Sequence, residues 1–296
     1  MTTRHKAELF LFMTTFIWGS TFVVVKAGTE NISSSLFIAL RFGIGSLFFA
    51  VFLSRQLRSI TAQTLKKAGI LGLMLGVGIL LQNYGIYKTT ASKSAFITGL
   101  MVIFTPIAQL IIERRPPKLG NFLGIIVVTY GLYLLTSPSG SELNYGDSLV
   151  FISAIIFGVF IVYLDIFSKT ENVLHLAFLQ VTIVTLIALA VVPFENVQFI
   201  PSTQLILSLL YMGICATVFT TYIQTRYQKD TTPTRAVIIF TIEPVIASVL
   251  AYFVLNEVLG ITGVIGAALI IVGILVSEFF DSFTSKLFFK NQPAED

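Results

Sequence analysis

Charged residues and cysteine are both scarce in this sequence. Only 11% of the 296 residues are charged, whereas 55% are hydrophobic and the mean hydropathy is +0.88. Soluble domains carry roughly 25% charged residues, so most of this chain is suited to lipid rather than to water. The single cysteine, Cys215, excludes an internal disulfide and a cluster of thiolate metal ligands. The net charge of +4 is distributed in a way that does not indicate nucleic-acid binding.

Long apolar runs account for this composition. A helix that spans a bilayer needs about 20 mostly apolar residues, and ten segments satisfy this requirement. The predicted spans are residues 8–27, 34–53, 68–87, 94–112, 119–136, 147–167, 174–193, 204–224, 236–255 and 262–280. The connections are short, and residues 137–146, rich in Ser, Gly and Pro, form the loop between two halves. Arg4 and Lys6 precede the first run as in a signal peptide, but its length and the lack of a clear cleavage site favour a membrane span.

One stretch of the sequence occurs twice. QNYGIYKTTASKS at residues 82–94 corresponds to QTRYQKDTTPTRA at residues 224–236, so that equivalent residues are 142 positions apart. Matches near the start of both halves are 139 positions apart, for example Trp18 with Phe157, and those near the end are again 142 apart, for example Gly131 with Gly273. We therefore predict an all-α integral membrane protein built from two five-helix repeats. The repeats are residues 8–136 and 147–280, and a tail follows over residues 281–296.

The distribution of lysine and arginine predicts the orientation in the membrane. If both termini are cytoplasmic, nearly all of the 19 basic residues flank spans on the inner side, and only Lys88 and Lys93 fall in outer loops. Because each repeat holds an odd number of spans, the second repeat enters the bilayer from the opposite side. Inverted repeats of this kind recur in secondary transporters, where the binding site lies between the halves near the bilayer centre.

Several short motifs resemble those of one known family. The motifs are FIWGSTF (residues 16–22), LRF (40–42), TASKSAFITGL (90–100), TPTRA (232–236), EPV (243–245) and LNE (255–257). Their order and spacing resemble the EamA-type members of the drug/metabolite transporter superfamily, over the whole chain apart from the tail after Ser282. The resemblance implies ten spans in two repeats and a carrier of small metabolites, often amino acids or drug-like amphiphiles.

Two charged residues fall deep inside predicted spans. Arg41 lies about seven residues into its span, and Glu243 lies about as deep in a span that enters from the other side, so both approach the bilayer centre. Charges at this depth are costly and tend to face a cavity. Glu243 is therefore a candidate proton or substrate-ammonium site. The alternative is a structural role, in which Glu243 accepts hydrogen bonds from Arg41 or from backbone groups that Pro244 leaves unpaired.

Prolines and aromatic residues point to a central cavity. Pro106 and Pro244 occupy similar places in the two repeats and predict paired helix bends, although each could also be a simple packing kink. Aromatic walls with a few directed amide groups suit the binding of an amphipathic solute. The candidate lining residues are Trp18, Gln82, Asn83, Tyr84, Phe104, Tyr163, Tyr222 and Gln224. Each tyrosine suits an interfacial belt equally well, whereas Trp18 lies near mid-bilayer, where a belt residue would not lie.

These features favour a secondary transporter that works by alternating access in a bacterial inner membrane. Amino acids or related small amphipathic solutes are the preferred cargo, with protons or another ion as a candidate coupling partner. A sugar-phosphate cargo would need several basic groups, and Arg41 is the one good candidate. A channel or lipid scramblase remains an open alternative. An enzyme is disfavoured because His5 and His175 lie near span ends without a metal-binding motif, and we expect no cofactor and no metal.

The predicted orientation can be tested by labelling. In a Cys215→Ser background, Thr2→Cys and Ala294→Cys should react with an impermeant maleimide only after the membrane is opened, because both termini are expected to be cytoplasmic. Lys88→Cys, in a predicted outer loop, should react in intact cells and serves as the positive control. Reaction of only one terminus in intact cells would contradict an even number of spans.

Overall fold

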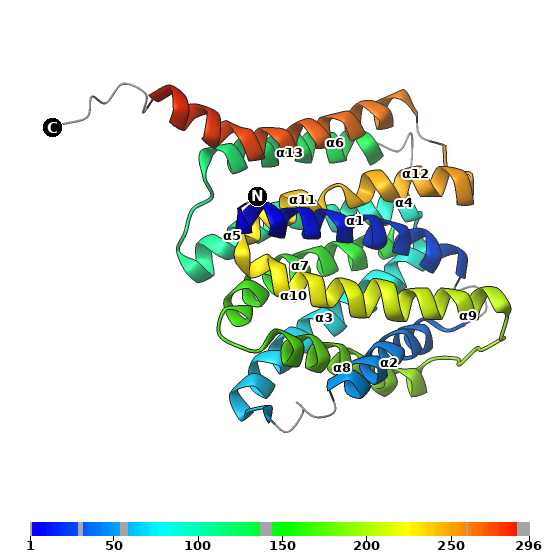
Figure 1. Ribbon diagram of the computed structural model, residues 1–296. Helices are drawn as coiled ribbons and strands as arrows, with labels where there is room; N and C mark the ends of the chain where they lie inside the picture. Colours follow the sequence, from blue (N-terminus) through cyan, green and yellow to red (C-terminus); the bar gives the residue numbers. More distant parts are fainter. Residues whose placement is uncertain (1, 29–31, 54–58, 137–143, 259, 289–296) are drawn as a thin grey trace.

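The computed structural model describes residues 2–28, 32–53, 59–136, 144–258 and 260–288. These residues form a bundle of ten helical rods that run mostly along one direction (Figure 1). The first five rods are α1 (Thr3–Gly28), α2 (Ser34–Leu53), α3 (Ala62–Lys88), α4 (Ala91–Gly99) continued by α5 (Met101–Glu113), and α6 (Leu119–Thr136). The second five are α7 (Tyr145–Ser168), α8 (Val173–Val191) with η2 (Val192–Phe194), α9 (Thr203–Leu210) continued by η3 (Tyr211–Phe219), α10 (Thr220–Tyr227) and η4 (Gln228–Asp230), α11 (Pro233–Phe240) with α12 (Glu243–Leu255), and α13 (Ile261–Phe288).

The rods correspond one to one with the predicted spans. Eight are long and apolar enough to cross a membrane, and α6 and α13 contribute the shorter apolar segments Leu119–Leu134 and Ile261–Ser277. Four boundaries differ from the prediction by five residues or more, at the starts of α1 and α3 and at the ends of η4 and α13. α3 begins six residues early because Thr61 caps it, accepting a hydrogen bond from the backbone N–H of Thr64 at 3.1 Å. α13 runs to Phe288, so part of the predicted tail is helical.

Equivalent helices begin and end at equivalent positions in the two halves. α4 begins at Ala91 and α11 at Pro233, and these residues are 142 positions apart. α5 and α12 both end in a residue with a left-handed backbone, Arg114 (φ 56°) and Asn256 (φ 54°), again 142 positions apart. Left-handed conformations are uncommon outside glycine, so their recurrence at equivalent positions supports a duplication.

Contacts between α6 and α13 show how the halves are related. A methyl group added at Gly124 would lie 2.8 Å from the carbonyl oxygen of Gly273, and one added at Gly131 would lie 2.8 Å from that of Gly266. Gly124 is equivalent to Gly266 and Gly131 to Gly273, so exchanging the halves converts one contact into the other. Reciprocal contacts of this kind define a twofold axis. The two helices are therefore antiparallel neighbours (Figure 1), and the predicted all-α membrane fold of two inverted repeats is confirmed.

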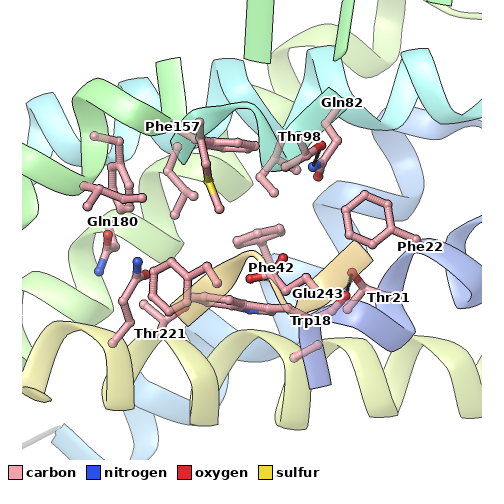
Figure 2. A pocket seen from close by; sticks show the side chains of 18 of the residues that line it. Trp18, Thr21, Phe22, Phe42, Gln82, Thr98, Phe157, Gln180, Thr221 and Glu243 are labelled. Carbon is pink, nitrogen blue, oxygen red and sulfur yellow. Dashed lines mark hydrogen bonds between the residues drawn. The ribbon is translucent and has the colours of Figure 1, made fainter. Parts of the chain in front are cut away.

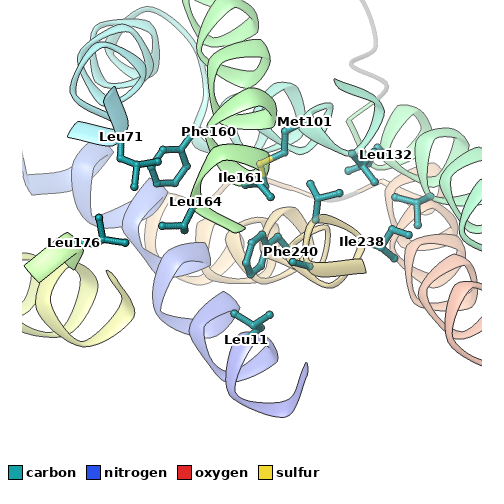
Figure 3. Close-up of a cluster of buried hydrophobic side chains, with 14 of the residues drawn as sticks. Leu11, Leu71, Met101, Leu132, Phe160, Ile161, Leu164, Leu176, Ile238 and Phe240 are labelled. Atoms are coloured by element: carbon teal, nitrogen blue, oxygen red, sulfur yellow. The ribbon is translucent and has the colours of Figure 1, made fainter. Parts of the chain in front are cut away.

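The largest buried apolar cluster lies where helices of both halves meet. It brings Leu11 of α1 and Leu71 of α3 together with Phe160 and Leu164 of α7 and Phe240 of α11 (Figure 3). In lipid the hydrophobic effect does not drive such helix association, so close packing of these side chains and of small residues has to hold the halves together.

Two rods are interrupted at equivalent positions. Between α4 and α5 the N–H of Leu100 bonds the carbonyl of Ile97 at 3.2 Å, and between α11 and α12 the N–H of Ile242 bonds that of Ile239 at 3.3 Å. These i→i−3 bonds make each break a tight 3-10 turn, although the N–H of Leu100 also bonds the carbonyl of Phe96 at 3.2 Å. Tight turns within a helix often mark a hinge. The breaks in the two rods lie at Leu100 and Ile242, and the bends at Pro106 and Pro244 stay predictions. Pro244 follows its break directly, whereas α5 continues through Pro106, so Pro106 does not mark the break in its rod.

The close approach of α6 and α13 predicts a stability effect. Gly131→Val would place a branched side chain against the backbone of α13, and overpacking of this kind costs roughly 1–3 kcal/mol. We expect a thermal midpoint several degrees lower in detergent. Gly69→Ala in α3 is the matched control, because a methyl group there meets nothing within 4 Å, and its midpoint should be unchanged or slightly raised. Equal midpoints for the two variants would contradict this packing.

Candidate functional site

A cavity of about 110 Å³ lies between the two halves, and Figure 2 shows side chains from opposite walls turned toward it. One water molecule occupies roughly 10–15 Å³ of such space, so the cavity admits a small solute or several waters. Most of its wall is aromatic or aliphatic, with a few amide, hydroxyl and charged groups. This combination is typical of sites that bind amphipathic molecules.

The cavity wall consists mostly of residue pairs that are equivalent in the two halves. The pairs are Trp18 with Phe157, Thr21 with Phe160, Phe22 with Ile161, Arg41 with Gln180, Ile79 with Thr221, Gln82 with Gln224, Thr98 with Phe240, and Met101 with Glu243. Phe42, Leu75 and Ala216 complete the lining. The cavity therefore lies on the pseudo-twofold axis, where inverted repeats are expected to place a transport site.

The two equivalent glutamines are both held at the wall by hydrogen bonds. The Nε2 of Gln82 donates to Oγ1 of Thr98 at 3.0 Å, a bond visible in Figure 2. The Nε2 of Gln224 donates to Oε1 of Gln228 at 3.2 Å, and the Nε2 of Gln228 donates to the carbonyl of Ile161 at 2.7 Å. These bonds fix the position of each amide before any solute arrives.

Trp18 and Arg41 are joined through the π-helical segment η3 and the residue that follows it. The indole N–H of Trp18 donates to Thr220 at 3.0 Å, and the Thr220 hydroxyl donates to the carbonyl of Ala216 at 2.9 Å. Arg41 donates to the same carbonyl at 3.2 Å and, through Nε, to Thr217 at 3.0 Å. π-helical segments frequently occur at functional sites. Here the segment supplies neutral oxygen acceptors for a buried guanidinium.

Glu243 stands at the first position of α12 and is only 6% exposed. Its Oε1 has no hydrogen-bond partner among the described residues, and within the same part of the chain Arg41 bonds Thr217 and Ala216 rather than Glu243. The positive end of the helix dipole favours a carboxylate at this position. A buried charge without a partner is costly, and in membrane helices such groups are retained mainly where they serve a function.

Five of the residues predicted at the cavity lie elsewhere. They are Asn83, Tyr84, Phe104, Tyr163 and Tyr222. Asn83 donates to the carbonyl of Ile79 within α3, and the Tyr84 hydroxyl pairs with Ser35 at 3.0 Å.

The other three are packed between helices or turned outward. Phe104 covers Gly158 and meets the ring of Phe151, and Tyr163 packs on Phe167. Tyr222 is 37% exposed. Trp18, Gln82, Gln224, Arg41 and Glu243 do line the cavity.

Sequence reasoning missed most of the aromatic wall and Gln180. The repeat offset could have found part of it, because it converts Trp18 into Phe157 and Arg41 into Gln180. Phe22, Phe42 and Phe240 carried no such signal, since apolar residues at these positions suit lipid or core equally well.

Comparison with known proteins identifies the class. The pattern of the EamA-like transporter family matches residues 5–137 and again residues 144–279. The chain belongs to this family and is a membrane transporter, as the motifs predicted. The two successive matches fall on the two five-rod halves.

Individual relatives agree with this assignment. An uncharacterized transporter of Archaeoglobus fulgidus is 30% identical over 273 residues, which are 92% of this chain and 86% of that protein. The uncharacterized transporter YoaV of Bacillus subtilis is 26% identical over 284 residues, covering 93% and 97%. A solved crystal structure, described only as that of a protein, has a TM-score of 0.75 at 17% identity and covers 94% of this chain and 98% of its own, which supports the fold alone.

The cavity contains the only tryptophan in the sequence, which provides a binding assay. A solute that enters the cavity should change the Trp18 emission, and Gln224→Ala should raise its half-saturating concentration about tenfold, the equivalent of one lost hydrogen bond. The measurement is a fluorescence titration of the purified protein with amino acids and alkyl amines.

Two variants control this titration. Trp18→Phe should abolish the signal, and Tyr222→Phe, outside the cavity, should leave the half-saturating concentration unchanged. Equal concentrations for Gln224→Ala and the unmodified protein would place binding elsewhere.

Proposed function

We propose that this transporter is a secondary-active carrier that moves a small metabolite by alternating access. The observation that carries the proposal is the symmetry of the cavity wall, in which inverted halves present equivalent residues to one space. If the halves exchange conformations, the same site faces first one side of the membrane and then the other. A channel or scramblase would not need a site of this kind.

The charges in the cavity suggest the cargo, because they break its symmetry. Arg41 is paired by position with the neutral Gln180, and Glu243 with the neutral Met101. The site therefore has one cationic and one anionic group between apolar walls. A zwitterion such as an amino acid fits this arrangement, with its carboxylate toward Arg41 and its ammonium toward Glu243.

A phosphorylated cargo fits less well. Phosphate groups are usually bound by several arginines or lysines. Among the described lining residues Arg41 is the sole base. We therefore favour amino acids or related amphipathic solutes over sugar phosphates.

Glu243 is the proposed coupling residue. A buried carboxyl that lacks a fixed partner can bind either a proton or the ammonium group of the cargo, and competition between the two would link their movements. We further propose that both termini face the cytoplasm in a bacterial inner membrane. Figure 1 shows α1 beginning and α13 approaching its end on the same side of the bundle, in keeping with an even number of crossings.

The coupling role leads to a prediction for transport in proteoliposomes. Glu243→Gln should abolish accumulation of labelled amino acid driven by a pH gradient, because the carboxyl can no longer exchange a proton. Counterflow should persist at reduced affinity, because the rest of the site remains. Glu113→Gln, at the end of α5 and outside the cavity lining, is the control and should retain both activities.

The same assay separates the competing functions. Saturable uptake with counterflow supports a carrier, whereas flux without saturation or single-channel currents would indicate a pore. Lipid movement without solute uptake would indicate a scramblase. pH-driven accumulation that survives in Glu243→Gln would remove the coupling role and leave the carrier proposal intact.

A further inference from the structure

The turn between α3 and α4 and the turn between α10 and α11 lie at opposite ends of the bundle, and each contacts both halves. Lys26, near the end of α1, donates to the carbonyls of Ile86 and Thr89 at the α3–α4 turn, at 3.1 and 2.7 Å. Glu8, near the start of α1, contacts the α10–α11 turn and α11. Glu8 and Lys26 are 18 positions apart on α1. At a rise of 1.5 Å per residue, the two turns lie about 27 Å apart along this helix.

At the end of the bundle where α1 begins, Arg235 of α11 and Glu8 of α1 form an ion pair, here named the α11 latch. Arg235 Nε lies 2.7 Å from Glu8 Oε1, and the two side chains are 8% and 10% exposed. The same Glu8 oxygen lies 2.9 Å from Nε of Arg4 and accepts a hydrogen bond from Thr231 at 3.2 Å. Gln228 in the same turn donates to the carbonyl of Ile161 in α7 at 2.7 Å, so this turn contacts both halves.

A second ion pair occurs at the equivalent positions at the other end of the bundle. Lys93 Nζ of α4 lies 2.7 Å from Asp147 Oδ2 of α7, with side chains 12% and 3% exposed, and we name this pair the α4 latch. Lys93 is the positional equivalent of Arg235, and Asp147 that of Glu8. Asn144 also donates to the carbonyl of Lys88 at 3.1 Å. One ion pair between the halves has thus been kept twice, once at each end.

Each latch is carried by a short arm that reaches the cavity. α4 extends from Ala91 to Gly99 and α11 from Pro233 to Phe240, and each ends at one of the two 3-10 turns. The last turn of each arm supplies one member of an equivalent pair of cavity residues, Thr98 and Phe240. An arm that swings about its 3-10 turn would therefore uncover the cavity toward its own end, and its latch would have to break first.

We propose that the α11 latch and the α4 latch are the two gates of the transporter, and that their relative strength decides to which side the cavity opens. This inference rests on the proposed alternating-access function. Both ion pairs are formed in this structure. Breaking a largely buried ion pair is costly, so each pair would hold its own end until its arm moves.

The test is the accessibility of the cavity from each side, read from a Thr221→Cys cysteine in a Cys215→Ser background with an impermeant maleimide. Membrane vesicles of both orientations are used. Glu8→Gln should raise the labelling rate from the end where α1 begins by about fivefold or more, and Asp147→Asn should do so from the opposite end. Both substitutions keep a hydrogen-bond acceptor and remove only the charge, so the cap of α7 by residue 147 is preserved.

Two controls separate a gate from a general structural role. Asp230→Asn removes an ion pair within the α10–η4 segment, that of Arg226, at the same end as the α11 latch and should not change labelling from either side. Lys93→Gln and Arg235→Gln remove the opposite charge of each latch and leave the cap by Asp147 intact, so they should raise labelling from the same ends as Asp147→Asn and Glu8→Gln. If a carboxylate variant does not purify as folded protein, the variant of its cationic partner decides, because unchanged labelling in it would overturn the proposal.

Shifts of Glu8→Gln and Asp147→Asn in the same direction, or no shift in either folded variant, would also overturn the proposal. Labelling needs no transport, so the two proposals fail independently. Opposite shifts in a protein that shows no counterflow would retain the latches and remove the carrier function.

Discussion

The absence of hydrogen-bond partners in lipid is the constraint on which this structure depends. Irregular backbone and charge are tolerated in a bilayer only where protein or trapped water surrounds them. The 3-10 turns at Leu100 and Ile242, the π-helical η3 and the charges of Arg41 and Glu243 all lie at or beside the cavity. Each departs from a regular apolar helix, and each is sheltered by the opposite half. The features that make a site possible are therefore the ones that require the two halves to stay together.

Lining residues that match between the two halves and lining residues that differ suit different roles within the proposed site. In the proposed carrier, equivalent lining residues such as Gln82 and Gln224 would meet the cargo alike from either half, which suits a site that serves two open states. Arg41 and Glu243 have neutral equivalents, so the polarity of the site is fixed relative to one half. A cargo with two unlike ends would then keep a single orientation through the whole transport cycle. The asymmetric charges are thus better suited to selecting the cargo than to moving the helices.

The sequence alone predicted the repeats, because the lengths of the apolar runs and the spacing of equivalent residues, 139 or 142 positions, can be read from the chain itself. It did not predict which face of each helix meets the cavity. Gln82, Asn83 and Tyr84 are consecutive, and successive helical residues point about 100° apart, so all three could not face one space. The α3 helix turns Gln82 inward and leaves Asn83 to bond its own backbone. The π-helical η3 left no signal either, since its equivalent segment in α3 is an ordinary α-helix.

The latches extend the same reasoning from the cavity to the ends of the bundle. Within the cavity the charged residues have neutral equivalents, whereas at the ends an ion pair occurs at equivalent positions, Arg235 with Glu8 and Lys93 with Asp147. The centre of a carrier has to recognise a solute that is itself asymmetric. Its ends have to close two opposite openings with comparable strength, or one state would dominate and transport would stop. Two ion pairs at equivalent positions around an asymmetric site are what the proposed alternating access would need.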